Sequence, residues 1–218
     1  MSGSPTAGGQ ESRTGRPPLT ERRKAATRLE IARAAVGLFT TQGVAATTTD
    51  QIAQVVGISS RTLWRYFANK EACVQPLLTA GVEAVARCLR AWAPGRSLTE
   101  ALDALEEEAE AGTPPIQVTQ DTATILALAR LTRTEPGLRA VWLQAHADAE
   151  PAFAQALALR AGIPADDPQS RLQAAMINGA IRAAIEHHAD NTTDGAEDVT
   201  LYVPLRTALL AAAQGLPD

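Results

Sequence analysis

Apolar residues recur with a helical period in the first half of this chain. Ile31, Ala35, Leu38 and Phe39 lie at positions i, i+4, i+7 and i+8, which share one face of an α-helix. Gly43 follows this stripe, and glycine commonly ends helices because it adopts the left-handed conformation without steric cost. The pattern therefore predicts an amphipathic helix that ends at Gly43.

Two short helices are predicted directly after it. Thr48 and Gln51 have the spacing of a capping box, in which each side chain binds the backbone N–H of the other residue. Gly57 closes this helix after about two turns, and Ser59 is placed to cap a third helix over residues 60–67. A short helix, a turn and a second short helix form a helix-turn-helix.

Similar signals divide the rest of the chain into helices. Asn69 caps a fourth helix, in which Pro76 is expected to produce a kink because proline has no backbone N–H. Pro151 is a candidate interruption of a later helix for the same reason. The further helices are expected over residues 97–111, 121–132, 135–161, 168–188 and 197–214. No internal repeat or strand pattern is evident, so the predicted fold class is all-α.

Charge is distributed unevenly along the chain. Residues 1–70 carry ten lysines and arginines against four acidic residues, whereas residues 71–218 carry ten against twenty. A basic head on an acidic body favours a polyanionic partner for the head alone, the alternative being chance segregation. Residues 1–20 lack apolar periodicity and are expected to form a disordered arm, which either contacts DNA or is simply solvated.

The outward side of the third helix is rich in groups that bind nucleic acid. Its donors and planar groups suit base edges and phosphates in a major groove, and they are Ser60, Arg61, Thr62, Trp64, Arg65 and Tyr66. Helix-turn-helix geometry also occurs as inert helix packing. A purely structural helix, however, has no reason to expose two aromatic residues beside two arginines, so we expect DNA binding.

These motifs resemble the DNA-binding domain of the TetR family of one-component regulators. The resemblance covers roughly residues 20–75 and rests on several ordered runs, which are Ile31-Ala32-Arg33-Ala34-Ala35, Thr47-Thr48-Thr49-Asp50-Gln51-Ile52-Ala53, Val56-Gly57-Ile58-Ser59 and Thr62-Leu63-Trp64-Arg65-Tyr66-Phe67-Ala68-Asn69-Lys70-Glu71. It implies a homodimer, usually a repressor, with an N-terminal three-helix helix-turn-helix domain at residues 21–70. It further implies a C-terminal helical ligand-binding and dimerisation bundle at residues 71–218.

The resemblance also implies roles for individual residues toward a double-stranded DNA operator. Thr48 matches a phosphate-contacting cap, Lys70 matches a phosphate-contacting lysine, and Trp64 stands where the family more often has tyrosine. The indole N–H can still donate a hydrogen bond there. The residues expected to bind DNA are Thr48, Ser59, Ser60, Arg61, Thr62, Trp64, Arg65, Tyr66 and Lys70.

The C-terminal region is similar to a TetR subgroup with an acyl-CoA-like ligand domain. Its helices are mainly apolar with few polar companions, which favours a small hydrophobic effector. The residues expected to line the ligand pocket are Thr124, Leu128, Trp142, His146 and Phe153. The alternative for each of them is plain core packing.

A stripe of mostly small residues in the penultimate helix predicts the dimer interface. Leu172, Met176, Gly179, Ala180 and Ala183 recur at a spacing of three and four, which lets helices approach closely across a two-fold axis. The alternative is that this stripe packs within its own domain.

The sequence carries no recognisable catalytic motif. His187 and His188 are adjacent and cannot share a metal as an i, i+4 pair would, so neither a metal site nor a cofactor is expected. No membrane-spanning run or secretory signal is evident, so a cytoplasmic protein is expected. Two functions remain open: a ligand-responsive transcription factor, or a binding or carrier module with a vestigial helix-turn-helix.

Overall fold

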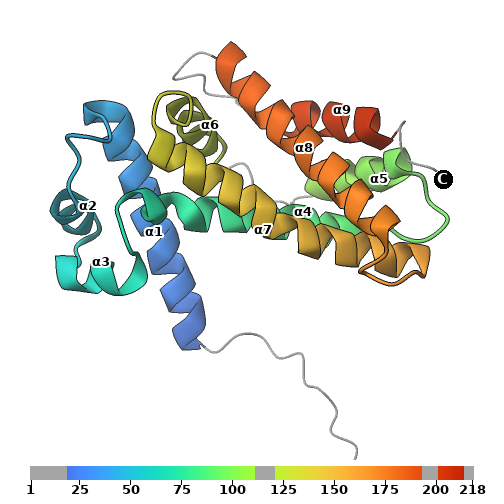
Figure 1. Ribbon diagram of the computed structural model, residues 1–218, viewed down its shortest axis with the longest axis horizontal. Coiled ribbons are helices and arrows are strands. Elements are labelled where there is room, and N and C mark those ends of the chain that lie inside the picture. The colour runs from blue at the N-terminus through green and yellow to red at the C-terminus, as the bar shows by residue number, and fades with distance from the viewer. Residues whose placement is uncertain (1–18, 111–120, 193–200, 214–218) are drawn as a thin grey trace, which may run out of the picture.

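The computed structural model describes residues 19–110, 121–192 and 201–213, and every regular element in them is a helix (Figure 1). The predicted arm falls on residues 1–18 outside this range, apart from its last two residues, which begin the first helix. The elements are α1 (Leu19–Gln42), α2 (Thr49–Val56), α3 (Ser60–Tyr66), the 3₁₀ helix η1 (Glu71–Val74), α4 (Gln75–Ala91), α5 (Leu98–Glu110), α6 (Thr122–Leu131), α7 (Pro136–Ala161), α8 (Pro168–Asn191) and α9 (Tyr202–Ala213).

The first three helices form a compact unit at one end of the molecule (Figure 1). The fully buried Ile31 and Phe39 of α1 pack with Ile52 of α2 and Leu63 of α3. The same apolar core continues through η1 and α4 into α6 and α7, where it includes Trp142. The helix-turn-helix unit and the C-terminal helices are therefore joined by one buried core.

The remaining helices form a bundle around α7. This helix packs against both α4 and α8, and α8 in turn packs against α9. A second core lies here and centres on Phe153 of α7 and Ile177 and Ile181 of α8. A capping box between Ser97 and Glu100 begins α5, within the helix predicted over residues 97–111.

The proline predictions need correction. Pro76 does not kink a long helix, because residues 71–74 form a separate 3₁₀ turn and α4 begins only at Gln75. The proline therefore lies in the first turn of α4, where backbone N–H groups have no partner within the helix and none is lost. Pro151 does not interrupt α7 either. Both Pro151 and Ala147, whose carbonyl the missing N–H would have bound, are exposed, so water can bind that carbonyl instead.

One apolar stretch is long enough to span a membrane, although no such run was evident from the sequence. Within the described residues, Glu71–Ala91 is long and apolar enough to span a membrane on length and composition alone. It packs against α1 and α7 and exposes the charged residues Glu83, Arg87 and Arg90. These features are those of a core helix in a folded domain.

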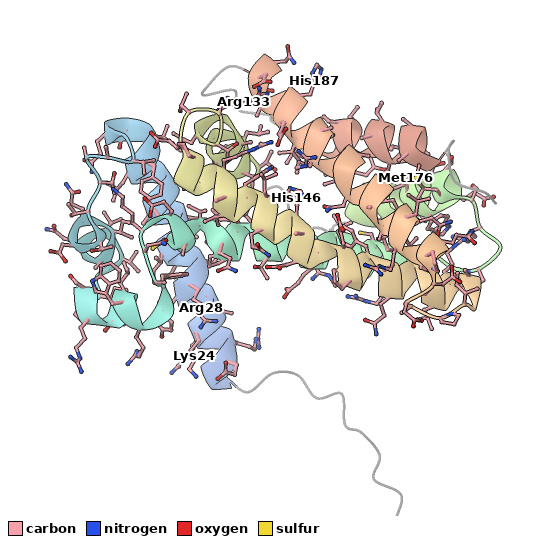
Figure 2. The ribbon with its side chains drawn as sticks, viewed as in Figure 1. Lys24, Arg28, Arg133, His146, Met176 and His187 are labelled. Atoms are coloured by element: carbon pink, nitrogen blue, oxygen red, sulfur yellow. The ribbon has the colours of Figure 1, made fainter. Side chains whose placement is uncertain are left out.

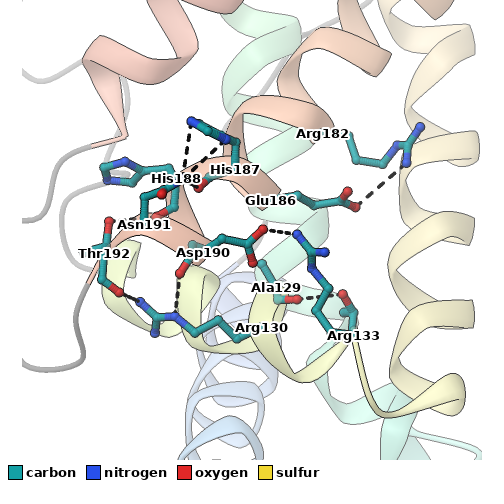
Figure 3. Close-up of polar contacts among 12 residues, drawn as sticks. Ala129, Arg130, Arg133, Arg182, Glu186, His187, His188, Asp190, Asn191 and Thr192 are labelled. Carbon is teal, nitrogen blue, oxygen red and sulfur yellow. Dashed lines mark hydrogen bonds and ion pairs between the residues drawn. The ribbon is translucent and has the colours of Figure 1, made fainter.

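Polar contacts fasten α6 to the end of α8 (Figure 3). Arg130 donates to the carbonyl oxygens of Ala189 and Thr192, each at 2.7 Å, and Arg133 forms an ion pair with Asp190. The exposed His187 lies beside Asn191 at this end of α8. These contacts fix the position of α6, the helix that also packs against α1.

Candidate nucleic-acid interface and ligand cavity

The helix-turn-helix has the caps that its sequence predicts. The Thr48 hydroxyl accepts from the N–H of Gln51 at 3.2 Å, and the Gln51 side chain accepts from the N–H of Thr48 at 2.8 Å. Gly57 takes the left-handed conformation with φ of +73°, and the N–H of Ile58 then binds the carbonyl of Ala53 at 3.0 Å. These local bonds set the angle at which α3 leaves the turn.

The third helix is anchored on one side and open on the other. The Ser59 side chain accepts from the N–H of Thr62 at 3.2 Å and caps the helix, while Leu63 is fully buried. Arg61 and Arg65 are exposed, and half of the Trp64 surface is accessible at 50%. Helix α3 thus presents two guanidinium groups and an indole to solvent.

Three of the side chains predicted to face outward are only partly accessible. Ser60, Thr62 and Tyr66 are half-buried. The Thr62 hydroxyl lies 2.9 Å from that of Ser59, so it takes part in the cap, and Tyr66 packs against the core of the domain. The outward surface of α3 is therefore narrower than its sequence indicates.

Arg28 of α1 belongs to this surface, although the sequence did not identify it. Its guanidinium lies 5.3 Å from the centre of the Tyr66 ring, and that of Arg65 lies 5.4 Å from the same ring. Figure 2 shows Arg28 and Lys24 on the exposed N-terminal part of α1. The sequence near Arg28 offers only the preceding run of basic residues as a sign of DNA binding. The contact with Tyr66 cannot be read from it, because that contact depends on how α1 and α3 are placed in the fold.

Lys70 has a structural role in addition to its predicted one. Its ammonium group donates to the carbonyl oxygens of Val44 at 2.5 Å and Thr47 at 3.0 Å. These carbonyls belong to the loop that positions the Thr48 cap. Since an ammonium group has three donors, one remains for a phosphate.

A cavity of about 300 Å³ lies between the N-terminal unit and the bundle. Its wall is mainly apolar and is formed by α1, α4, α6, α7, α8 and α9. The polar and charged residues on the wall are Arg33, Glu83, Arg87, Asp121, His146 and Asn178. A small volume, an apolar wall and a few polar groups are the general features of a small-molecule site.

The structure brings together three of the five residues predicted to line a pocket. Trp142, His146 and Phe153 lie on the cavity wall, whereas Leu128 is fully buried in the core and Thr124 is not among the lining residues. The correction concerns α6, which turns other residues toward the cavity. The helical period was clear from sequence, but which face of α6 meets α4 and α7 depends on tertiary packing.

His146 is held in a hydrogen-bonded network at the cavity wall. Its Nδ1 lies 2.7 Å from the side-chain oxygen of Asn178, and the Asn178 amide donates to the backbone carbonyl of His146 at 2.8 Å. The Trp142 ring packs edge-on against the imidazole at 5.1 Å between ring centres. Burial lowers the pKa of His146, so the imidazole is neutral near pH 7.

The cavity wall also carries an ion pair that the sequence did not reveal. Arg33 of α1 donates to both carboxylate oxygens of Asp121, from Nε at 2.5 Å and from a terminal nitrogen at 2.9 Å. The two residues are 88 positions apart, so no local pattern signals their contact. Asp121 raises the pKa of Arg33 by accepting these bonds.

The predicted dimer stripe lies along the outer side of α8. Leu172 is 63% exposed and Ala183 is exposed, whereas Met176, Gly179 and Ala180 are half-buried. The opposite side, with Ala174, Ile177 and Ile181, packs into the second core. Figure 2 places Met176 on α8 in the bundle, away from the helix-turn-helix end. Packing within the domain accounts for that opposite side and leaves Leu172 and Ala183 uncovered.

The fold and the exposed basic helix define a helix-turn-helix DNA-binding protein with an all-helical C-terminal domain. Residues 31–77 match the family described as bacterial regulatory proteins, tetR family, and residues 116–217 match the MftR C-terminal domain. The transcriptional regulator TcmR of Streptomyces glaucescens is 31% identical over 152 residues, which cover 69% of this chain and 67% of that protein. The chain belongs to the TetR family of transcriptional regulators, which are not enzymes.

Solved structures agree in fold. The fatty acid degradation regulator FadR from Bacillus halodurans is 18% identical, with a TM-score of 0.51 over 87% of this chain and 96% of that one. A TetR-family regulator from Mesorhizobium loti is also 18% identical, with a TM-score of 0.50 over 88% of this chain and 97% of the other. At these identities the likeness concerns the fold.

Proposed function

We propose that this chain is a homodimeric repressor, which leaves a pseudo-palindromic operator when a small hydrophobic effector occupies the cavity. Its DNA-binding domain comprises residues 21–70, its ligand-binding and dimerisation domain comprises residues 71–218, and it acts in the cytoplasm. The observation that carries the proposal is a capped recognition helix that exposes Arg61, Trp64 and Arg65, joined through one core to helices that enclose a cavity.

The DNA-contacting surface proposed here has two kinds of group. Arg61 and Arg65 reach base edges or phosphates from α3, with Ser60 and Thr62 at its start and Trp64 and Tyr66 flanking the groove. Thr48 and Ser59 place helix N-termini toward phosphates, and Lys70 adds its remaining donor. Arg28 extends the basic surface onto α1.

The alternative, a carrier module with a vestigial helix-turn-helix, is disfavoured by this same surface. A domain that no longer binds DNA gains nothing from a half-exposed Trp64 beside exposed arginines, because an exposed indole loses the hydrophobic gain of burial. The cavity alone fits both functions. The two are therefore separated by a test of DNA binding.

A mobility-shift titration with DNA from the region upstream of the chain's own coding sequence provides that test. Wild-type protein should shift this DNA. Arg61→Ala should weaken the free energy of operator binding by about 1–3 kcal/mol through the loss of one base contact, while its non-specific DNA binding is retained. Arg90→Ala removes an exposed arginine from α4 and serves as the matched control, which should bind as the wild type does. Equal operator binding by wild type and an Arg61→Ala/Arg65→Ala double variant would refute this surface as the DNA-binding face.

A further inference from the structure

The Arg33–Asp121 ion pair connects the proposed DNA-binding domain to the cavity. Arg33 lies on α1, one turn and a half from Arg28, which stacks on Tyr66 of the recognition helix. Asp121 lies at the start of α6, and both residues are on the cavity wall. The side chain of Asp121 is only 12% exposed, whereas that of Arg33 is 39% exposed. The carboxylate is therefore the more deeply buried partner, and a molecule in the cavity can reach the guanidinium.

Asp121 occupies a position that offers its carboxylate a second arrangement. It is the N-cap residue of α6, yet it makes no capping hydrogen bond: its backbone ψ of 3° is not the extended one of a capping residue, and both of its oxygens accept from Arg33. An aspartate at this position ordinarily accepts from the backbone N–H groups of the first helical turn. If another carboxylate took its place on Arg33, a turn of the Asp121 ψ angle toward the extended region would bring its side chain to donors within its own helix.

The cavity determines what kind of molecule could make that exchange. Its wall is mainly apolar and its volume, about 300 Å³, is at the lower end of the range for small-molecule sites. The planar guanidinium binds a carboxylate through two parallel hydrogen bonds, and the geometry of the Asp121 contact already has this form. A neutral carbonyl could accept one bond from a remaining donor of Arg33, but it would not displace Asp121.

We propose that the effector is a small apolar carboxylic acid whose carboxylate replaces that of Asp121 on Arg33, and that Asp121 then caps α6. The exchange breaks the ion pair between α1 and α6, so α1 and the recognition helix in contact with it can change position relative to the bundle. This inference rests on the proposed function, since it names the ligand class and the switching contact of the same cavity.

Calorimetric titration with octanoate and with octanol tests the exchange without DNA. The two probes share an apolar chain and differ in the carboxylate. Wild-type protein should bind octanoate more tightly than octanol. Arg33→Gln should lose about tenfold or more in octanoate affinity, with its octanol affinity unchanged. Asp121→Asn should bind octanoate more tightly than wild type does, because the competing negative charge is gone. Arg90→Gln removes an exposed arginine of α4 that does not line the cavity and serves as the control, expected to match wild type.

The opposite responses of Arg33→Gln and Asp121→Asn distinguish exchange from a structural effect, which would weaken both probes in both variants. The inference is overturned if wild type fails to bind octanoate, if Asp121→Asn binds it more weakly, or if Arg33→Gln keeps the preference for octanoate that wild type and Arg90→Gln show. A chain that passes this titration but shifts no operator refutes the proposed function only. A chain that binds its operator but fails the titration refutes the exchange only.

Discussion

The neutral imidazole of His146 makes the stability of the protein depend on pH. Burial lowers its pKa and outweighs the hydrogen bond with Asn178, which raises it, while the nearby charges of Arg182 and Glu186 act in opposite directions. In the unfolded chain a histidine titrates near its ordinary pKa of about 6.5. The unfolded state therefore binds more protons than the folded state as the pH falls through this value, which destabilises the fold.

We expect the free energy of unfolding to fall as the pH is lowered from 7.5 through about 6.5, until the pH reaches the lowered folded-state pKa. Glutamine at position 146 cannot be protonated, so His146→Gln should show a shallower decrease over this window. Urea unfolding at several pH values measures the difference. A His187→Gln variant, altered at an exposed position, provides the control and should keep the wild-type slope. Equal slopes for wild type and His146→Gln would contradict the prediction.

Lys70 shows how one side chain can serve both the fold and the interface. We expect Lys70→Ala to lower the free energy of unfolding by about 1–3 kcal/mol, because two charge-assisted bonds to the carbonyls of Val44 and Thr47 are lost. Lys24→Ala, which removes an exposed lysine of α1, should change it little. Equal unfolding curves for wild type and Lys70→Ala would show that these bonds contribute nothing to stability.

At the scale of single helices, boundaries follow from residues that lie close together in sequence. The Thr48–Gln51 box, the Gly57 turn and the Ser59 cap are all completed within a few residues, so the sequence predicts them well. Pro76 and Pro151 were misjudged because the effect of a proline depends on its place in the helix and on the exposure of the carbonyl it leaves unpaired. Those properties depend on the surrounding fold.

The turn before the recognition helix supplies a test at this scale. Gly57→Ala should destabilise the protein by about 1 kcal/mol or more, because alanine at φ of +73° suffers steric strain that glycine avoids. Gly37→Ala is the matched control: this glycine lies inside α1 with open space around a new Cβ, so the change should stabilise by about 0.5–1 kcal/mol. Thermal unfolding should show shifts of opposite sign, and shifts of the same sign would refute the assignment.

At the scale of the whole molecule, the sequence predicted the all-helical fold and the helix-turn-helix but only part of the cavity. Trp142, His146 and Phe153 share α7, so a helical pattern within one element brought them together. Arg33 and Asp121 come from helices that are distant in sequence, and nothing local to either residue indicates the other. A site built between elements is fixed by how those elements pack, which a pattern along one helix does not specify.

The proposed dimer gives a prediction for the assembled molecule. Ala183→Glu places a charge on the exposed side of α8 without disturbing the core of the single chain, so it should yield monomers in sedimentation experiments. Ala140→Glu introduces the same charge at an exposed position of α7 and should leave the wild-type assembly intact. A dimeric Ala183→Glu variant would place the interface elsewhere.

The shared apolar core limits how far this regulator can be treated as modular. Ile31 and Phe39 of α1 are buried in one cluster with Leu126 and Trp142, far along the chain. A chimera that joined residues 19–70 to the C-terminal domain of another regulator would lose the packing partners of these side chains. Losing such contacts around large core residues typically lowers the free energy of unfolding by several kcal/mol. New DNA specificity is therefore easier to engineer by exchanging only the outward residues of the recognition helix than by transplanting the whole DNA-binding domain.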